Sequence, residues 1–364
     1  MCPYDNCLFY KRSGTRFIIC AVYVDDSFTI TNWPEESTAF KMNMTTLFGV
    51  KTFSPIEWFL GWHFQRDRTA GACTISQTQF TIDACKRFGL HDRYPKKQPC
   101  PTGHTFEELD QDQLLDADGQ RQFMEKVGTL NYLATSSRSD IAWVTSKLGM
   151  YMQQGDKHAM LIADQVFLYL LGTADDGITI RRSAGLILTA FSDASFGDSG
   201  KTCNGRRRSQ SGCSIKLGNI TIVSYSRAQK NVTLSTFESE YVALSLAVQE
   251  VIWCRRLLAS LGFAQNSPTV VYEDNEAAQL LASSNLQTRR SRFVDCRFHY
   301  TREMVAEGEI VVRRCPTAHM EADLFTKALS QEVLRQHWNT VRGETSLDTS
   351  ALSLAAIINL TGME

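Results

Sequence analysis

The segment STFESEYVAL, residues 235–244, begins the longest amphipathic helix that the sequence predicts. Apolar residues recur at three-to-four spacing from Thr236 to about Leu261, and a glycine follows the last of them. Ser235 and Glu238 fit a capping box, so Glu238 is expected to bond the start of the helix. Glu240 has no such structural role, and of the two glutamates it is the stronger candidate for chemistry.

Strands on both sides of this helix indicate a mixed sheet. Three strands precede it, and the Gly218-Asn219 pair between the second and the third is typical of a tight hairpin turn. Two further strands follow it and alternate with helices, which favours a five-stranded mixed sheet flanked by helices. The expected strands are 186–193, 212–217, 220–226, 269–272 and 309–314, and the later helices are 275–282, 293–306 and 321–329.

The rest of the chain divides into further stretches, as expected for 364 residues in two or three domains. Residues 101–120 are polar and acidic and predict an exposed linker, and the last 20 or so residues lack a convincing pattern and are expected to be a loose tail. Elsewhere we expect strands at 17–23, 27–31, 58–64 and 74–77 and helices at 35–48, 79–88, 123–134, 141–151 and 158–171. The fold class is therefore α/β and α+β, multidomain, with expected domains 1–100, 101–185, 186–330 and 331–364.

Composition and charge narrow the class of protein. The chain is 43% apolar and 21% charged, as in soluble globular proteins, and its net charge of −1 argues against a purely electrostatic nucleic-acid binder. The 11 cysteines include no C-x-x-C pair, which argues against a disulfide framework or a zinc site. The sequence has neither a signal-peptide pattern nor an apolar run of the roughly 20 residues that span a bilayer. We therefore expect an intracellular, soluble protein.

Four carboxylates stand where sheet proteins commonly place chemistry. Asp193 ends the first strand of the predicted sheet and Asp274 follows the fourth, so the two side chains converge if these strands are neighbours. Glu240 lies in the first turns of the long helix, and Asp323 opens the helix predicted at 321–329. Clustered acids of this kind can share two Mg²⁺ ions, or Mn²⁺, about 3.5–4 Å apart for an in-line phosphoryl displacement.

Each acid also has a structural interpretation. An aspartate after a strand, taken alone, is more often a turn or helix N-cap residue than a metal ligand. Glu238 remains the competitor of Glu240 for a place in the site. His319 is interpreted as a surface-loop residue rather than as a general acid or base.

Taken together and in this order, six segments resemble the ribonuclease H of copia-type retrotransposons, over almost all of 186–329. The resemblance implies that Asp193, Glu240, Asp274 and Asp323 match the metal-binding acids of the family. One departure is Glu273, where a small or apolar residue is expected; its charge can perturb the site but removes no ligand. The segments are S-D-A-S at 192–195, R-R-x-S-x-S-G ending at Gly212, S-x-x-E-x-E-Y-x-A-L at 235–244, E-D-N-x-A-A at 273–278, V-D-x-R-x-H-Y-x-R-E at 294–303 and A-D-L-F-T-K-A-L at 322–329.

Residues 1–100 resemble the palm and thumb of a copia-type reverse transcriptase. Y-V-D-D at 23–26 lies between two apolar strands, C-L-F-Y-K at 7–11 precedes it and F-L-G-W at 59–62 follows it, while 127–134 resembles the connection before ribonuclease H. The resemblance implies that Asp25 and Asp26 are a relic of a polymerase metal site; the structural alternative is an aspartate pair in a solvent-edge turn. The first palm motif and the fingers are expected before Met1, so the stretch is interpreted as truncated, and we predict no DNA synthesis by this chain alone.

Basic and polar residues near the four acids are candidates for binding a nucleic acid. Arginines could hold the phosphate backbone of an RNA–DNA hybrid, and small polar side chains could contact its 2′-hydroxyls. The alternative for each basic cluster is a solvated surface. The candidates are Arg207, Arg208, Arg290 and Arg292 for phosphates, and Ser195 and Asn275 for hydroxyls.

The sequence therefore leads to three functional hypotheses. The first is a metal-dependent endonuclease that cuts RNA in RNA–DNA hybrids. The second is an inactive relic or a nucleic-acid-binding fragment, and the third is a reverse transcriptase completed by a partner chain. The expected partners are an RNA–DNA hybrid and other polyprotein products but no membrane, and the expected location is a cytoplasmic virus-like particle or the nucleus.

Overall fold

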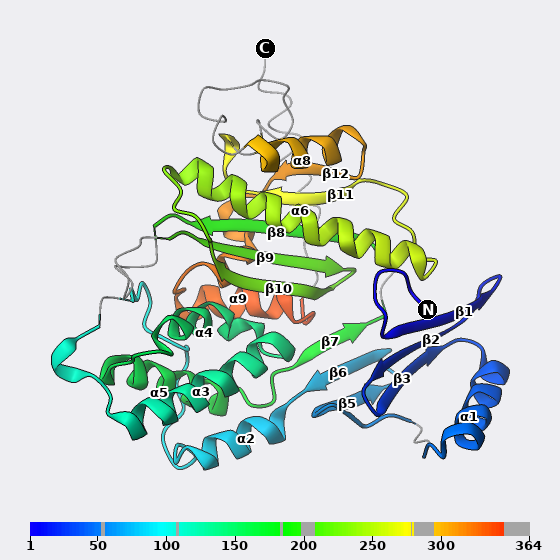
Figure 1. Ribbon diagram of the computed structural model, residues 1–364, viewed down its shortest axis with the longest axis horizontal. Coiled ribbons are helices and arrows are strands. Elements are labelled where there is room, and N and C mark those ends of the chain that lie inside the picture. The colour runs from blue at the N-terminus through cyan, green and yellow to red at the C-terminus, as the bar shows by residue number, and fades with distance from the viewer. Residues whose placement is uncertain are drawn as a thin grey trace.

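The computed structural model describes residues 1–51, 55–106, 109–182, 185–197, 208–277, 279 and 295–345, and only the backbone of 295–298. Among these residues no helix is long and apolar enough to cross a bilayer. Figure 1 shows a C-terminal sheet at the top, a group of helices below it and smaller N-terminal sheets at the right.

The C-terminal sheet has five strands in the order β10-β9-β8-β11-β12, which confirms the expected mixed sheet. Strands β8, β9 and β10 are antiparallel, whereas β8, β11 and β12 run parallel. The long helix α6 covers one face, and α8 lies beside it (Figure 1). The bounds are β8 (Leu188–Ser195), β9 (Gln210–Leu217), β10 (Ile220–Ala228), α6 (Thr236–Ser260), β11 (Thr269–Glu273), α8 (Asp295–Ala306) and β12 (Ile310–Arg314).

The register of β8 against β11 places the ends of these two strands side by side. Phe191 on β8 pairs with Tyr272 on β11. Asp193 and Asp274 each come two residues later, so they lie at the same edge of the sheet. The convergence expected from the sequence is therefore present in the fold.

The two faces of the sheet carry different cores. On one face Leu188, Ala190 and Val271 pack against the apolar side of α6. On the other face Phe191 and Tyr272 stack with ring centroids 4.9 Å apart and form a smaller core with Cys315, Met320 and Ala322. Because side chains alternate along a strand, neighbouring residues at the strand ends face opposite sides.

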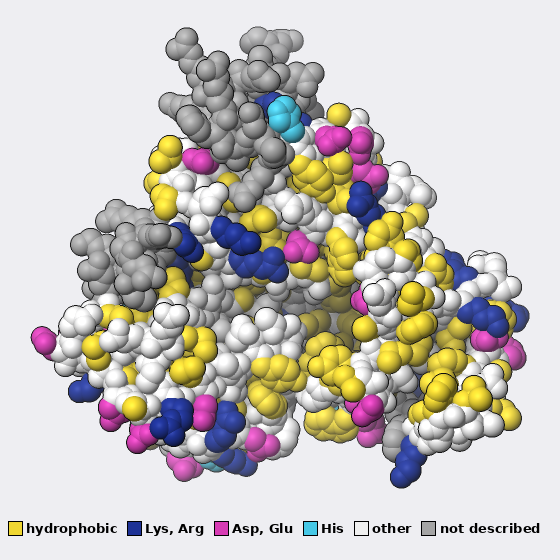
Figure 2. All heavy atoms as spheres, viewed as in Figure 1, with side chains coloured by type: hydrophobic (Ala, Val, Ile, Leu, Met, Phe, Trp, Pro, Cys, Tyr) yellow, Lys and Arg dark blue, Asp and Glu magenta, His cyan; other side chains and the backbone are white. Residues whose placement is uncertain are grey.

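The N-terminal part contains two small antiparallel sheets, β1-β2-β3 and β4-β5-β6-β7. Strand β7 was not expected from the sequence; it follows the helix predicted at 158–171 and pairs with β6, about a hundred residues earlier in the chain. None of the residues of α1, all of which the structure describes, is buried. Figure 2 shows hydrophobic side chains gathered over this part of the surface, at the right. The bounds are β1 (Leu8–Ser13), β2 (Arg16–Tyr23), β3 (Asp26–Thr31), α1 (Pro34–Phe48), β4 (Trp58–Phe59), β5 (Trp62–Asp67), β6 (Ala72–Ser76) and β7 (Ile178–Arg181).

A helical core joins the two ends of the molecule. The stretch 101–120, expected to be an exposed linker, contributes Phe106, which is only 4% exposed and lies 5.7 Å from the ring of Trp143. One aromatic side chain thus holds part of a polar segment against the helices. The elements here are α2 (Thr78–Arg87), the 3₁₀ turn η1 (Gln111–Gln113), α3 (Ala117–Ser136), the 3₁₀ turn η2 (Ser139–Ile141), α4 (Ala142–Leu148), the 3₁₀ turn η3 (Gly149–Tyr151) and α5 (Lys157–Gly172).

The C-terminal elements differ from the sequence-based expectation. The 3₁₀ turn η5 (Thr317–His319) leads into a second 3₁₀ segment, η6 (Glu321–Phe325), which replaces the helix expected at 321–329. A further helix, α9 (Gln331–Val341), lies at the start of residues 331–364, which we had assigned to a tail. Its buried residues Leu334, Trp338 and Val341 recur at spacings of four and three, which is a helical signal that the interpretation missed.

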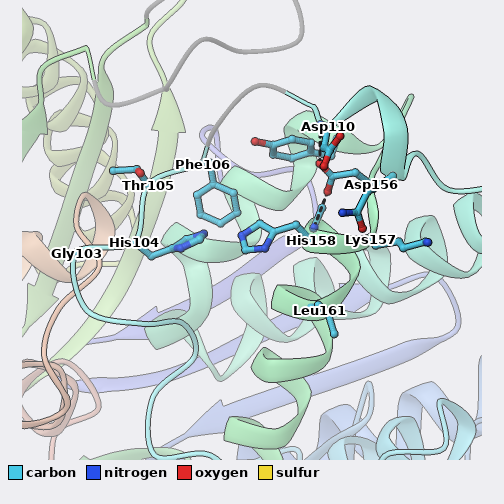
Figure 3. Close-up of a pocket in the computed structure, with 12 residues that line it drawn as sticks. Gly103, His104, Thr105, Phe106, Asp110, Asp156, Lys157, His158 and Leu161 are labelled. Atoms are coloured by element: carbon cyan, nitrogen blue, oxygen red, sulfur yellow. Dashed lines mark hydrogen bonds between the residues drawn. The ribbon is translucent and has the colours of Figure 1, made fainter.

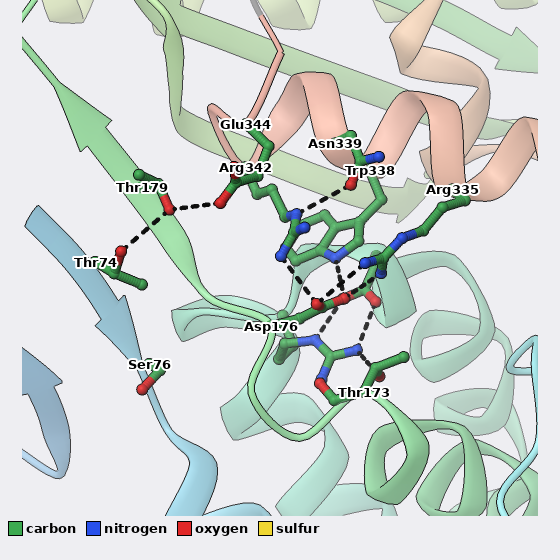
Figure 4. A network of polar contacts seen from close by, with 12 residues as sticks. Thr74, Ser76, Thr173, Asp176, Thr179, Arg335, Trp338, Asn339, Arg342 and Glu344 are labelled. Atoms are coloured by element: carbon green, nitrogen blue, oxygen red, sulfur yellow. Dashed lines mark hydrogen bonds and ion pairs between the residues drawn. The ribbon is translucent and has the colours of Figure 1, made fainter. Parts of the chain in front are cut away.

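Helix α9 is held by a polar network around Asp176 (Figure 4). The Asp176 carboxylate accepts hydrogen bonds from Trp338 Nε1 at 3.0 Å and Arg342 Nη1 at 2.9 Å, and it also pairs with Arg335. The buried guanidinium of Arg138 lies 5.8 Å from the Trp338 ring. Asp176 precedes β7, so this network fastens the last described helix to the helical core.

Candidate metal centre

Three carboxylates meet at the edge of the C-terminal sheet. Asp193 comes from β8, Glu240 from α6 and Asp274 from the residue after β11. One oxygen of each lies within 4.8 Å of the others, a spacing that could hold a metal ion. Asp193 is 1% exposed and Glu240 is 5% exposed, so the group is largely shielded from water.

The start of α6 explains which glutamate joins this group. Ser235 caps the helix, and its hydroxyl accepts a hydrogen bond from the Glu238 backbone N–H at 3.2 Å. The Glu238 carboxylate reaches back to the Leu234 N–H at 2.7 Å. Glu238 therefore has the capping role that we predicted. Glu240, two residues further, lies on another side of the helix, because successive helical residues are rotated by about 100°.

The fourth predicted acid, Asp323, lies apart from this trio and is paired with a lysine. Asp323 belongs to η6 and is 6% exposed. The Lys327 ammonium lies 2.6 Å from Asp323 Oδ1 and 3.5 Å from Asp193 Oδ2. Thr326 donates a hydrogen bond to Asp193 from the same turn. Lys327 and Thr326 thus join the site without having been predicted, although both belong to the A-D-L-F-T-K-A-L segment.

A close approach of η6 to the sheet makes this pairing geometrically feasible. Gly212 on β9 lies directly across from Asp193. A Cβ at Gly212 would come within 2.7 Å of Thr326 Cγ2 and 2.9 Å of Phe325 Cβ. Glu321, at the start of η6, accepts hydrogen bonds from Ser214 Oγ at 2.6 Å and Lys216 Nζ at 3.1 Å on β9. The lack of a side chain at Gly212 lets η6 approach β9, and the buried ion pair of Glu321 and Lys216 holds it there.

Burial and like charge raise the pKa values of the clustered acids. Burial, and then the charges of Asp193 and Asp274, raise the pKa of Glu240 to about 9. Burial and Asp193 also raise the pKa of Asp323 to about 7, against the opposing effect of Lys327. The pKa of Asp274 is raised for the same two reasons. Among the described residues, Glu240 Oε2 has no hydrogen-bond partner. A cation bound at Glu240 Oε2 would supply a partner to this buried oxygen.

Glu273, which we expected to perturb the site, lies fully buried on the α6 side of the sheet. Burial, followed by the charge of Glu240, raises its pKa well above the usual value for glutamate. Its Oε1 accepts a hydrogen bond from the Asn275 N–H at 3.3 Å, and within the described part of the chain Oε2 has no partner. Because it precedes Asp274 on the strand, it faces away from Lys327 and towards Glu240.

The other predicted site residues are more scattered. Asp25 is exposed in the turn between β2 and β3, and Asp26 is the exposed first residue of β3. Both lie beside a cavity of about 470 Å³ that Phe40 and Met44 of α1 also line. In the regions that the structure describes, neither belongs to a group of three candidate metal ligands. Ser195, Arg208 and Asn275 are partly buried, and Ser195 pairs with Gln210 across the sheet. Arg207, Arg290 and Arg292, and half of the helix predicted at 275–282, lie outside the described residues.

A second cavity, of about 680 Å³, lies among the helices (Figure 3). His104 and His158 face each other there, with ring centroids 5.4 Å apart, and Asp110 and Asp156 lie nearby. Asp156 caps α5 by accepting a hydrogen bond from the Ala159 N–H at 2.8 Å. None of the described lining residues belongs to the acid group at the sheet edge.

Comparisons with known proteins match both parts of the chain. The family described as "Reverse transcriptase (RNA-dependent DNA polymerase)" matches residues 2–102. The "Retrovirus-related Pol polyprotein from transposon TNT 1-94" of Nicotiana tabacum is 28% identical over 92% of this chain and 26% of its own length. The corresponding polyprotein from transposon RE2 of Arabidopsis thaliana is 29% identical over 90% of this chain and 22% of its own length.

The chain thus spans about a quarter of the length of these relatives. Among solved structures, the match to the foamy viral protease-reverse transcriptase in complex with RNA/DNA hybrid covers 82% of the present chain and 36% of the viral protein. The two proteins are 12% identical, and the TM-score is 0.47. At that similarity the fold assignment rests on the strand order β10-β9-β8-β11-β12 itself.

Proposed function

Because this chain belongs to the Pol polyproteins of copia-type retrotransposons, we propose that residues 186–330 form a ribonuclease H that cuts RNA in RNA–DNA hybrids. The observation that carries the proposal is the buried acid trio of Asp193, Glu240 and Asp274, whose oxygens lie within 4.8 Å of one another. Such a group is costly to bury without a cation, because like charges in a shielded environment repel one another. A site built for a divalent ion offsets this cost.

The donor set fits Mg²⁺, with Mn²⁺ as an alternative. Both are hard cations that prefer carboxylate oxygens, and the trio offers only such oxygens. Glu240 Oε2, which has no hydrogen-bond partner among the described residues, is a buried oxygen that is available to a cation. When bound, divalent ions would activate water and stabilise the leaving oxygen of a phosphoryl displacement.

The residues of the chain have separate tasks in this proposal. Asp193 and Asp274 are held by the paired strands β8 and β11, and Glu240 is held by the packed helix α6, so the oxygens keep their spacing before any ion binds. Glu240 must lose its proton to act as a ligand, and a nearby cation favours the carboxylate form. Asp323 stays anchored through Lys327 at the margin of the group.

We extend the proposal to the substrate. Ser195, Asn275 and Arg208 are the described candidates for contacts to sugar hydroxyls and phosphates of the hybrid. Arg207, Arg290 and Arg292 remain sequence-based candidates. Other polyprotein products are the proposed protein partners, and a cytoplasmic virus-like particle or the nucleus is the proposed location.

A second candidate function rests on the match of residues 2–102 to reverse transcriptases. Asp25 and Asp26 are exposed beside a cavity, and in the described chain no third acid joins them in a metal-binding group. We propose that a polymerase site at Asp25 and Asp26 would use a further metal ligand from a partner chain. Restored synthesis on adding a fingers-and-palm fragment would support completion by a partner; its absence would count against it.

The ribonuclease proposal is tested by incubating purified protein and Mg²⁺ with a hybrid labelled on its RNA strand. Asp274→Asn removes one carboxylate of the trio and should abolish cutting. Asp118→Asn is the matched control, because Asp118 is exposed on α3 and pairs only with Arg121 at its surface. Cutting by the wild type and the control, but not by Asp274→Asn, is the expected result. No cutting with Mg²⁺ or Mn²⁺ would leave a folded relic or a binding protein.

A further inference from the structure

The Lys327 ammonium lies between two of the four predicted metal-binding acids. Its Nζ is 2.6 Å from Asp323 Oδ1 and 3.5 Å from Asp193 Oδ2. The two carboxylates are almost fully buried, whereas the lysine side chain is 40% exposed. The positively charged Lys327 side chain therefore lies beside the acid trio and contacts one of its members, Asp193.

The position of this ammonium is fixed by the fold around it. Lys327 follows Asp323 by four residues, and its backbone N–H bonds the Asp323 carbonyl at 3.1 Å. Its neighbour Thr326 bonds Asp193, and Gly212 leaves the space that this turn occupies. The pair therefore belongs to a packed turn rather than to a freely moving surface contact.

The four acids thus differ in whether a cationic side chain lies near them. Glu240 and Asp274 have no cationic side chain within ion-pair distance among the described residues, whereas Asp323 does and Asp193 is shared. A divalent ion that used Asp193 together with Asp323 would have to approach the ammonium closely, and like charges at such a separation repel strongly in a partly buried site.

We propose that Lys327 limits the acid group to one strongly bound divalent cation, because its ammonium takes the place between Asp193 and Asp323 that a second cation would need. This inference rests on the proposed metal site. It makes Lys327 a specificity-determining residue for the number of ions, and it assigns Asp323 to holding that ammonium while one ion is bound. A second ion binds only when Lys327 has turned away into solvent.

The inference is tested by titrating the full chain with Mn²⁺ in the absence of nucleic acid and measuring bound ions by electron paramagnetic resonance. The wild type should bind one ion tightly and a second more weakly. Lys327→Gln should tighten the second ion roughly tenfold or more, because an opposing unit charge has been removed. Lys327→Arg keeps the charge and should behave as the wild type. Lys327→Met gives a second neutral side chain of similar length if the glutamine variant fails to fold.

The outcomes separate this inference from the proposed function. Two ions of similar affinity in the wild type, or an unchanged second affinity in both neutral variants, would overturn the role of Lys327 and leave the metal site standing. Weaker binding in the neutral variants would also overturn it, since the lysine would then only support the turn. No bound Mn²⁺ in any variant would overturn both. Asp274→Asn, measured in the same way, should lose the tight ion.

Discussion

The Y-V-D-D turn and the acid trio of the C-terminal sheet both consist of carboxylates, but they occupy different environments. Asp25 and Asp26 are neighbours in one exposed turn. Asp193, Glu240 and Asp274 come from three elements that are up to 81 residues apart in the chain, and they meet in a buried group. Adjacent residues in extended chain point to opposite sides, so a turn alone does not aim two carboxylates at one ion. At the C-terminal sheet, the packing of several elements brings the three acids together.

The largest expected effect separates these two groups by activity. Glu240→Gln removes a buried carboxylate of the trio and should lower hybrid cleavage by about a thousandfold or more, since a metal contributes several kcal/mol to such a reaction. Asp25→Asn and Asp26→Asn should leave cleavage unchanged. Rates with the labelled hybrid measure both effects. Loss of cleavage in the Asp25 variant would place that turn in the nuclease site and remove the contrast.

A smaller effect concerns the packing that supports the trio. Asp176→Asn leaves Arg335 and Arg342 without their common carboxylate, although both keep some access to water. We expect the free energy of unfolding to fall by about 2–3 kcal/mol, towards the lower end for a broken buried ion pair. Denaturant titration measures this change. Asp118→Asn, at an exposed pair on α3, should change it by less than about 1 kcal/mol. Equal effects of the two variants would show that α9 contributes no more than a surface contact.

A third expected effect is the pH dependence of the metal-free protein. Glu240 titrates near pH 9 in the fold, against an ordinary value of 4.5, so the folded state holds its proton over that interval. The stability contributed by this group is complete below pH 4.5 and is lost as the pH rises towards 9. Asp323 adds to the same trend up to about pH 7. The free energy of unfolding should therefore fall between about pH 5 and 9.

Two variants and added Mg²⁺ identify which groups cause the free energy of unfolding to fall with pH. Glu240→Gln and Glu273→Gln should each flatten the slope of that free energy against pH, because each removes one acid with a raised pKa. Saturating Mg²⁺ should reverse it, since the ion binds the deprotonated carboxylates. Chemical denaturation from pH 5 to 9 measures the slope. An unchanged slope in both variants would mean that the trio does not control this pH dependence.

Local patterns in the sequence predicted much of the C-terminal half. The position of Asp193 near the end of a strand, that of Asp274 after another strand, and the capping box of Ser235 and Glu238 each depend on a few neighbouring residues. All three are present in the structure, although β8 continues two residues beyond Asp193. From the sequence, the convergence of Asp193 and Asp274 was expected only if the first and fourth strands of the sheet are neighbours, and the strand order in the structure meets that condition. Six motifs in a fixed order strengthened this interpretation.

The features that sequence reasoning missed depend on contacts between distant residues. Strand β7 forms because β6 offers it an edge, and Phe106 is buried because helices of the core surround it. The turn that pairs Lys327 with Asp323 approaches β9 only because residue 212 has no side chain. Helix α9 is the exception, since its apolar spacing was readable and was overlooked.

The most direct test of the metal site is to grow crystals of the protein with Mn²⁺ and to record their diffraction at the manganese absorption edge. We expect an anomalous peak between the carboxylates of Asp193, Glu240 and Asp274 and none at Asp25 and Asp26. An anomalous peak at the Y-V-D-D turn and none at the sheet edge would contradict the proposed metal site.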